Sequence, residues 1–270
     1  MRTEKIKVVI LAGGRGSRLS EETETIPKPM VEIGGKPILW HIMKMYSHYG
    51  FNDFVICLGY RGYMIKEYFS HYFMHMSDVT IDLEKNRTVI HNTSSEPWKI
   101  TLVDTGSDTM TGGRLRRVQP FIKGKSFLMT YGDGLANIDL KDLLLTHRKN
   151  RRAATLTAVQ TSLRFGVLDI NAHSMVNTFL EKPKGKSSWI NGGFFVLEPE
   201  VFSYLKDEDL TVWEREPLEN LARDGQLAAY RHRGYWQCMD TLRDKNELEG
   251  LIRAKRAPWM IWELAGGHDS

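Results

Sequence analysis

The stretch IKVVILAGGRGSRL, residues 6–19, decides the fold of this chain. Residues 6–12 form an apolar, largely β-branched run, which is typical of a strand buried on both faces of a parallel sheet. Three glycines and two arginines follow within residues 13–18. Small residues let backbone N–H groups approach phosphate oxygens, and an arginine adds a planar fork that matches a phosphate. The stretch predicts a phosphate-binding turn at the end of a central strand; a tight turn without a ligand is the alternative.

The glycine turn fits neither of the two common nucleotide motifs. In the dinucleotide pattern G-x-G-x-x-G, Gly14 and Gly16 match, but Leu19 stands at the third glycine position. The P-loop needs Gly-Lys-Ser/Thr, and position 18 is an arginine. An NAD(P)-dependent oxidoreductase therefore remains only as a rival hypothesis. An arginine at position 18, in place of the missing pattern, points to a triphosphate that is cleaved. We expect its phosphates to be approached by Gly13, Gly14, Gly16, Ser17 and Arg18.

Composition indicates an ordinary globular enzyme. The chain has 270 residues, of which 41% are hydrophobic and 26% charged, and its net charge is +4. A mild charge without a basic stripe of interleaved aromatics argues against a nucleic-acid partner. The apolar run at the N-terminus is too short for a signal-peptide core or a membrane span, so we expect a cytoplasmic enzyme with no membrane partner. Cys57 and Cys238 form no C-x-x-C pair and stand in apolar surroundings, which predicts two buried thiols.

Strand-like and helix-like segments alternate along the first part of the chain. This order predicts an α/β fold with a Rossmann-like, doubly wound, mixed and mostly parallel sheet flanked by helices. Residues 78–105 alternate more like exposed or edge strands, and residues 112–122 are expected as one short helix. Asp139 is expected to cap the amphipathic helix that follows it. From about residue 160 the pattern loosens into a smaller β-rich region that faces the substrate and ends in a C-terminal helix. We expect one domain over 1–270, with 1–160 mainly the nucleotide-binding half and 161–270 mainly the substrate half.

Two lysines stand next to prolines, in PKPM (Lys28) and EKPK (Lys182). A following proline biases each lysine toward an extended backbone, which fixes where its side chain points. A lysine so placed can supply a point charge to an oxyanion, although an exposed loop lysine is the alternative for either one alone. Asn191, in WINGGFFVLEP, is a candidate for binding sugar hydroxyls, while a β-bulge or hairpin turn explains the pattern equally well.

Two aspartates are candidates for holding a metal ion. Asp133, in TYGDG, follows an apolar strand, and ligands bind at the carboxyl ends of strands in open α/β sheets. Asp240, in CMDT, comes just before a helix start, where Thr241 and Asp244 have capping-box spacing. Mg²⁺ is typically held by one or two carboxylates plus substrate phosphates. A turn residue near a helix N-terminus is the alternative for Asp240.

Taken together, these motifs resemble the sugar-1-phosphate nucleotidylyltransferase family over nearly the whole chain. The matching motifs, in order, are VVILAGGRGSRL, PKPMVEIGGKPILWHI, YGDG, EKP, NGGFFV and MDT. Residues 96–118, 164–170 and 256–262 resemble the branch of that family that transfers cytidylyl groups to glucose 1-phosphate. The resemblance implies CTP and a sugar 1-phosphate as substrates, Mg²⁺ as cofactor and a homo-oligomer. The same chemistry with UTP, dTTP, GTP or another sugar phosphate, and a nucleotide-sensing module without turnover, remain as alternatives.

The resemblance also implies roles for individual residues. Leu11, Gly13 and Gly14 would line the base and ribose of the nucleotide. The nucleotide phosphates would meet Gly16, Ser17, Arg18 and Lys28, and Asp133 would also belong to the nucleotide site. Arg114 would reach the triphosphate or the sugar phosphate, within its own subunit or across an interface. Asp133 and Asp240 would hold Mg²⁺ and, with Arg18 and Lys28, form the catalytic set. The sugar phosphate would meet Glu181, Lys182, Asn191 and Gly193. Ser17 departs from the threonine usual in the family, and TSLRFG (161–166) replaces a run that commonly contains Pro and Gly.

Overall fold

A mixed β-sheet forms the centre of the molecule. The computed structural model describes residues 6–16, 19–161, 167–171, 174–180, 188–206 and 208–264, and within these ranges the largest sheet has nine strands. Its parallel part consists, in spatial order, of β8 (Phe127–Tyr131), β1 (Lys7–Leu11), β4 (Asp53–Leu58) and β7 (Lys99–Asp104). The glycine turn therefore follows a strand that has a parallel neighbour on each side, as the sequence predicts.

The other side of the sheet is largely antiparallel. Strand β13 (Ser188–Leu197) pairs antiparallel with β8 and carries the sheet into the second half of the chain. Beyond it lie β10 (Ala154–Thr161), β14 (Leu227–Arg231), β11 (Val167–Ile170) and β12 (Val176–Leu180). Strand β13 is thus shared by both halves, and the predicted mixed, doubly wound sheet is confirmed.

Alternate residues of β1 enter two separate apolar cores. Val8 and Ile10 lie in one core, Val9 and Leu11 in the other, and none of the four is more than 7% exposed. The first core packs against α2 (Ile38–His48), α6 (Leu140–Asn150) and α8 (Leu242–Arg253). The second packs against α4 (Thr111–Arg117), α5 (Gln119–Ile122) and α7 (Glu216–Arg223). Helices therefore cover both faces of the sheet, which explains the unbroken apolar run of the first strand.

Helix ends follow their local sequence. Asp139 caps α6 by accepting from the backbone N–H groups of Lys141 and Asp142, as predicted. Thr241 and Asp244 form the predicted capping box of α8. Residues 112–122, expected as one short helix, instead form α4 and α5. The break falls before Pro120, which has no N–H to continue the first helix and whose ring crowds the preceding turn.

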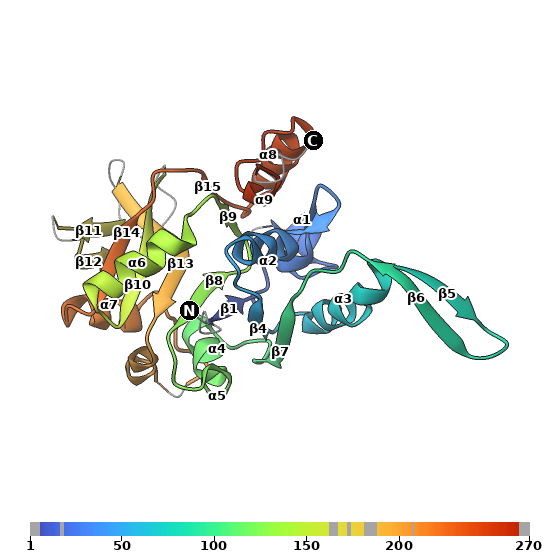
Figure 1. The fold of residues 1–270 in the computed structure, drawn as a ribbon. Coiled ribbons are helices and arrows are strands. Elements are labelled where there is room, and N and C mark those ends of the chain that lie inside the picture. The colour runs from blue at the N-terminus through green and yellow to red at the C-terminus, as the bar shows by residue number, and fades with distance from the viewer. Residues whose placement is uncertain are drawn as a thin grey trace.

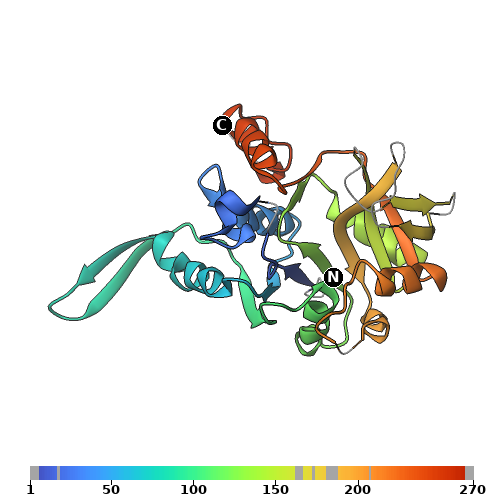
Figure 2. The same cartoon turned by 180° about the vertical axis from the view of Figure 1, so that it is seen from behind.

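A β-hairpin of β5 (Ser77–Asp82) and β6 (Arg87–Thr93) projects away from the body of the molecule (Figures 1 and 2). It follows α3 (Gly62–His75), and β7 then returns to the edge of the main sheet. The edge-like character read from residues 78–105 therefore has two origins: an exposed hairpin and an edge strand.

The remaining elements of the described ranges are short. They are α1 (Ser20–Thr23), η2 (Lys28–Met30), β2 (Glu32–Ile33), β3 (Lys36–Pro37), β9 (Gly134–Ala136), η3 (Pro199–Tyr204), β15 (Trp236–Cys238) and α9 (Ile261–Leu264). None of the helices in the described ranges has both the length and the apolar character needed to span a membrane.

Candidate active site

Hydrogen bonds to its carbonyl oxygens hold the glycine turn after β1 in place. Gly13 directs its carbonyl oxygen toward the backbone N–H of Tyr60 (3.0 Å) and toward the guanidinium of Arg114 (3.0 Å). Gly16 has a positive φ of 64°, and its carbonyl oxygen accepts from Thr23 Oγ1 at 3.1 Å. Gly14 is exposed, whereas Leu11 beneath it is buried. The turn is therefore anchored at both ends, with Gly14 open to solvent between them.

Arg114 lies underneath the turn and donates to protein oxygens, while its contact with a phosphate stays a prediction. Its side chain is buried, and burial lowers the pKa of its guanidinium from the usual value. The guanidinium donates to five oxygens, at distances between 2.7 and 3.3 Å: those of Gly13, Leu58, Gly106, Ser107 and the Thr105 hydroxyl. Because these bonds join the glycine turn to the end of β4 and to the loop after β7, Arg114 shapes the backbone of the turn.

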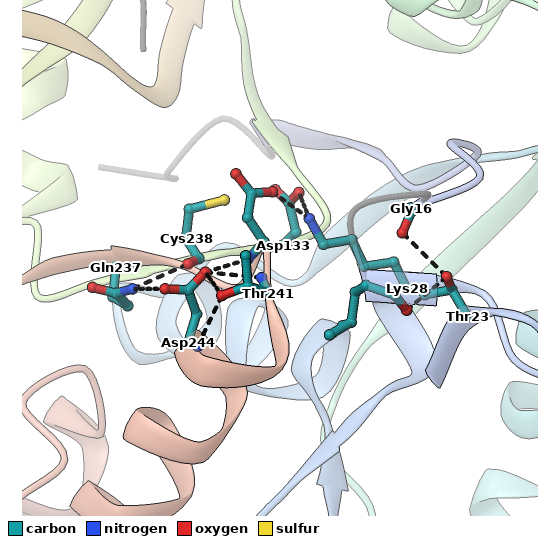
Figure 3. A network of polar contacts seen from close by, with 10 residues as sticks. Gly16, Thr23, Lys28, Asp133, Gln237, Cys238, Thr241 and Asp244 are labelled. Carbon is teal, nitrogen blue, oxygen red and sulfur yellow. Dashed lines mark hydrogen bonds and ion pairs between the residues drawn. The ribbon is translucent and has the colours of Figure 1, made fainter. Parts of the chain in front are cut away.

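Lys28 contacts both of the aspartates that the sequence singles out, and Figure 3 shows it beside Asp133. Its Nζ atom donates to Asp133 Oδ2 and to Asp240 Oδ1, each at 2.7 Å. Burial alone lowers the pKa of Lys28, but the charges of Asp133, Cys238 and Asp240 outweigh it, and the net effect is a raised pKa. Lys28 is therefore a buried ammonium ion, and the alternative of an exposed loop lysine is wrong for it.

Neighbouring strands fix the two carboxylates. Asp133 lies between β8 and β9, and its carbonyl oxygen accepts from the N–H of Met239 at 2.9 Å. Strand β15 pairs antiparallel with β9, with Cys238 opposite Gly134. The backbone N–H of Asp240 donates to Asp244 of the capping box at 3.1 Å. Asp240 is thus both a residue before a helix and a partner of Asp133, so the two hypotheses for it are compatible.

Cys238 joins the two carboxylates to form a group of potential metal ligands. One ligand atom from each of Asp133, Cys238 and Asp240 lies within 4.8 Å of the others. Cys238 is half-buried beside charged groups, so the expectation of a buried thiol in apolar surroundings is wrong here. It is confirmed for Cys57, whose burial raises its thiol pKa to about 12. The sequence carried one signal for this role of Cys238, which stands two residues before Asp240. Alternate residues of an extended chain point to the same side.

On the substrate side, Asn191 and Gly193 lie on β13 where this strand passes from β8 to β11. The pairing with β10 shifts register at this point, so the bulge proposed from the sequence is present. Asn191 Oδ1 accepts from the N–H of Gly193 at 2.8 Å. Both residues remain candidates for the sugar side. Four predicted site residues lie outside the described ranges: Ser17, Arg18, Glu181 and Lys182.

Comparison with known proteins identifies the family. The model of the nucleotidyl transferase family matches residues 7–244. The chain belongs to this family. A glucose-1-phosphate cytidylyltransferase from Salmonella typhimurium is 58% identical over 259 residues, which cover 96% of this chain and 100% of that protein. A probable glucose-1-phosphate cytidylyltransferase from Bacillus subtilis is 46% identical over 257 residues, covering 95% of this chain and 100% of that protein.

Solved structures have the same fold as this nucleotidyltransferase. HddC from Yersinia pseudotuberculosis superposes with a TM-score of 0.73 at 24% identity, over 92% of this chain and 99% of that one. A UDP-glucose pyrophosphorylase complexed with UDP-glucose gives a TM-score of 0.73 at 18% identity, over 94% of this chain and 100% of that one. At these identities the likeness supports the fold alone, and it agrees with the doubly wound sheet.

Sequence reasoning missed several polar residues near the carboxyl end of β8. Tyr131, Glu214 and Thr111 are joined by short hydrogen bonds, although they come from three distant segments. None belongs to a pattern that spacing alone would reveal, since Glu214 stands 83 residues beyond Tyr131. Backbone hydrogen bonds from Met110 and Gly112 to Asp209 and Thr211 bring the segment of Glu214 to the start of α4.

We expect Lys28→Met to destabilise this nucleotidyltransferase by about 3–5 kcal/mol, because it leaves the buried carboxylate of Asp240 and the half-buried one of Asp133 without their cation. A divalent cation can take the place of the missing ammonium, so Mg²⁺ should raise the melting temperature of Lys28→Met more than that of the wild type. Thermal melts with and without Mg²⁺ measure both effects.

Lys44→Met is the matched control, since Lys44 pairs with the mostly buried Glu96 at 3.1 Å, away from the aspartates. It should lose stability without any recovery specific to Mg²⁺. Equal Mg²⁺ shifts in the wild type and in Lys28→Met would contradict a shared cation position.

Proposed function

We propose that this nucleotidyltransferase transfers a cytidylyl group from CTP to α-D-glucose 1-phosphate, giving CDP-glucose and pyrophosphate. The observation that carries the proposal is the 58% identity to a glucose-1-phosphate cytidylyltransferase over its whole length. The geometry supports the same chemistry. A glycine turn follows the central strand, and the Lys28–Asp133–Asp240 cluster lies at the carboxyl ends of neighbouring strands, where open α/β sheets bind ligands.

The reaction requires little acid–base chemistry. A phosphate monoester has its second pKa near 6, so the sugar phosphate oxygen is already an anion at neutral pH. This oxygen attacks the α-phosphorus of CTP, a new P–O bond forms, and the bond to the β-phosphate oxygen breaks in line with it. Pyrophosphate leaves with the electron pair of that bond. No proton has to be removed from the nucleophile, and no histidine or cysteine acts as a base.

The work of the protein is to bring two polyanions together. We assign Gly14 and Gly16 to approach the phosphates through their backbone and Lys28 to supply positive charge beside them. We further assign Arg18 to the triphosphate and Lys182, with Glu181, Asn191 and Gly193, to the sugar phosphate. Fixed positive groups and correct positioning stabilise the transition state without reorganising during the reaction.

The donor groups beside Lys28 fit a divalent cation. Asp133 and Asp240 offer carboxylate oxygens, the ligands that Mg²⁺ prefers, within 4.8 Å of one another. We propose that these two residues hold Mg²⁺, which would neutralise phosphate charge when bound. Lys28 then has a second role, since it keeps the same two carboxylates neutralised and oriented.

Asp133→Asn tests the metal assignment. We expect turnover to fall by about 10²–10³-fold, the scale of losing one electrostatic stabiliser. Because asparagine has the same shape and Lys28 keeps Asp240, the fold should survive. Asp139→Asn, at an exposed helix cap that asparagine also serves, is the control and should retain full activity. Wild-type turnover by Asp133→Asn would contradict the assignment.

A pyrophosphate-release screen tests the choice of substrates. CTP, UTP, dTTP and GTP are each combined with glucose 1-phosphate and with other sugar 1-phosphates, in the presence of Mg²⁺. We expect the highest kcat/KM for CTP with glucose 1-phosphate. A higher value for another nucleotide or sugar would reassign the substrate, and no release from any pair would favour a sensing module.

We also propose that the protein is a homo-oligomer. The projecting hairpin exposes Ile81 (57%), Leu83 (87%) and Ile90 (45%), and the end of α3 beside it exposes Phe73 and Met74. An apolar surface of this kind is typical of a protein interface. Ile81→Glu with Leu83→Glu should therefore lower the mass measured by light scattering, whereas Leu145→Glu, on an exposed face of α6, should not. A monomeric wild type would contradict the proposal.

A further inference from the structure

Glu214 is a carboxylate outside the Lys28–Asp133–Asp240 cluster that receives two short hydrogen bonds. Tyr131 Oη donates to its Oε1 at 2.5 Å, and Thr111 Oγ1 donates to its Oε2 at 2.6 Å. Tyr131 is the last residue of β8, two residues before Asp133, and Thr111 is the first residue of α4. The carboxylate is therefore held at both oxygens, at one by the end of β8 and at the other by the start of α4.

The chemistry of these groups fixes the direction of the hydrogen bonds. An ionised carboxylate only accepts, so the hydroxyl proton of Tyr131 is committed to Glu214. Burial, the charge of Glu214 and its hydrogen bond raise the pKa of Tyr131 well above the usual value, so this proton stays on the phenol. The phenolic oxygen then remains available only as an acceptor, and its partner there is the side chain of Asn191.

The amide of Asn191 is oriented as a consequence. Its oxygen accepts from the N–H of Gly193 at 2.8 Å, and Gly193 lies against the ring of Tyr131. The amide nitrogen is then the group of Asn191 that can donate to the oxygen of Tyr131, and its influence lowers the pKa of that phenol, as a donor does. Gly193, with φ of 80°, makes the arrangement possible, because a Cβ there would lie 2.6 Å from Tyr131 Cδ2. An amide nitrogen carries two N–H groups, so one remains after Tyr131 is satisfied.

We propose that Glu214 is a positioning residue for the sugar phosphate: through Tyr131 it fixes the amide of Asn191 so that its second N–H donates to an oxygen of that substrate. The inference rests on the proposed function, in which Asn191 belongs to the sugar side. Glu214 touches neither substrate and acts only through the tyrosine.

The second oxygen of Glu214 explains why the relay is rigid. Thr111 Oγ1, which donates to it, also accepts from the backbone N–H of Trp213 at 2.9 Å. The residue before Glu214 is thus bound to the same hydroxyl as its carboxylate. This closed arrangement keeps the carboxylate from turning away from Tyr131.

Steady-state kinetics with both substrates test the relay in Tyr131→Phe and Glu214→Gln. Each change removes or weakens one hydrogen bond, so the KM for glucose 1-phosphate should rise roughly three- to tenfold. The KM for CTP should change by less than about twofold from the wild-type value. The loss of a hydrogen bond to CTP would change it by more than that. The double variant should be no worse than Tyr131→Phe alone, since both residues act through one chain.

Tyr204→Phe is the matched control. It removes the same hydroxyl from another tyrosine–carboxylate pair, in which Tyr204 donates to Asp224 at 3.1 Å, away from Asn191. It should leave both KM values unchanged. Unchanged KM for glucose 1-phosphate in Tyr131→Phe and Glu214→Gln would overturn the relay, as would equal rises in both KM values.

Direct binding separates this inference from the proposed function. If the wild type releases no pyrophosphate from CTP and glucose 1-phosphate, the proposed function fails. Calorimetric titration with glucose 1-phosphate then still decides the relay. Weaker binding in Tyr131→Phe and Glu214→Gln, but not in Tyr204→Phe, would support it, and equal binding or no binding by the wild type would overturn it.

Discussion

The contact of Lys28 with Asp133 and Asp240 is the interaction on which the site depends. It joins segments that lie 105 and 212 residues apart, at 2.7 Å on each side. A buried charge is costly unless it is paired and hydrogen-bonded, so the three side chains stabilise one another in their positions. The ion pair therefore holds together the loop after the glycine turn, the end of β8 and the start of α8.

The charge of this cluster also bears on catalysis. Two carboxylates and one ammonium leave a net charge of −1, which would repel a triphosphate and a sugar phosphate. A divalent cation on the same carboxylates would reverse that sign, and its attraction to phosphate acts at short range in a partly buried site. On the proposed function, the cluster is thus complementary to its substrates only when the cation is bound.

Much of the fold follows from the sequence, because burial on both faces and helix capping leave local patterns. The apolar run of β1, the Asp139 cap of α6 and the capping box of α8 were predicted and are present. The two aspartates were selected by their positions at a strand end and a helix start. Their meeting at Lys28 was not derivable from spacing, since it depends on the pairing of β9 with β15.

Arg114 and Glu214 mark where sequence reasoning ends. The sequence does not show that Arg114 is buried beneath the glycine turn or that its guanidinium donates to five protein oxygens there. Glu214 belongs to no motif, and its partners come from α4 and β8. Such contacts are set by tertiary packing, which local patterns do not encode.

The stretch TYGDG, residues 130–134, unites these contacts at the end of one strand. Tyr131 faces Glu214 and Asn191, whereas Asp133 faces Lys28. The residue between them is Gly132, where a Cβ would lie 3.0 Å from Pro29 Cγ and 3.2 Å from the carbonyl oxygen of Leu11. A side chain at this position would push the lysine's own segment away from the strand. The short glycine-flanked stretch is therefore what lets one strand end serve the cation cluster and the sugar-side relay at once.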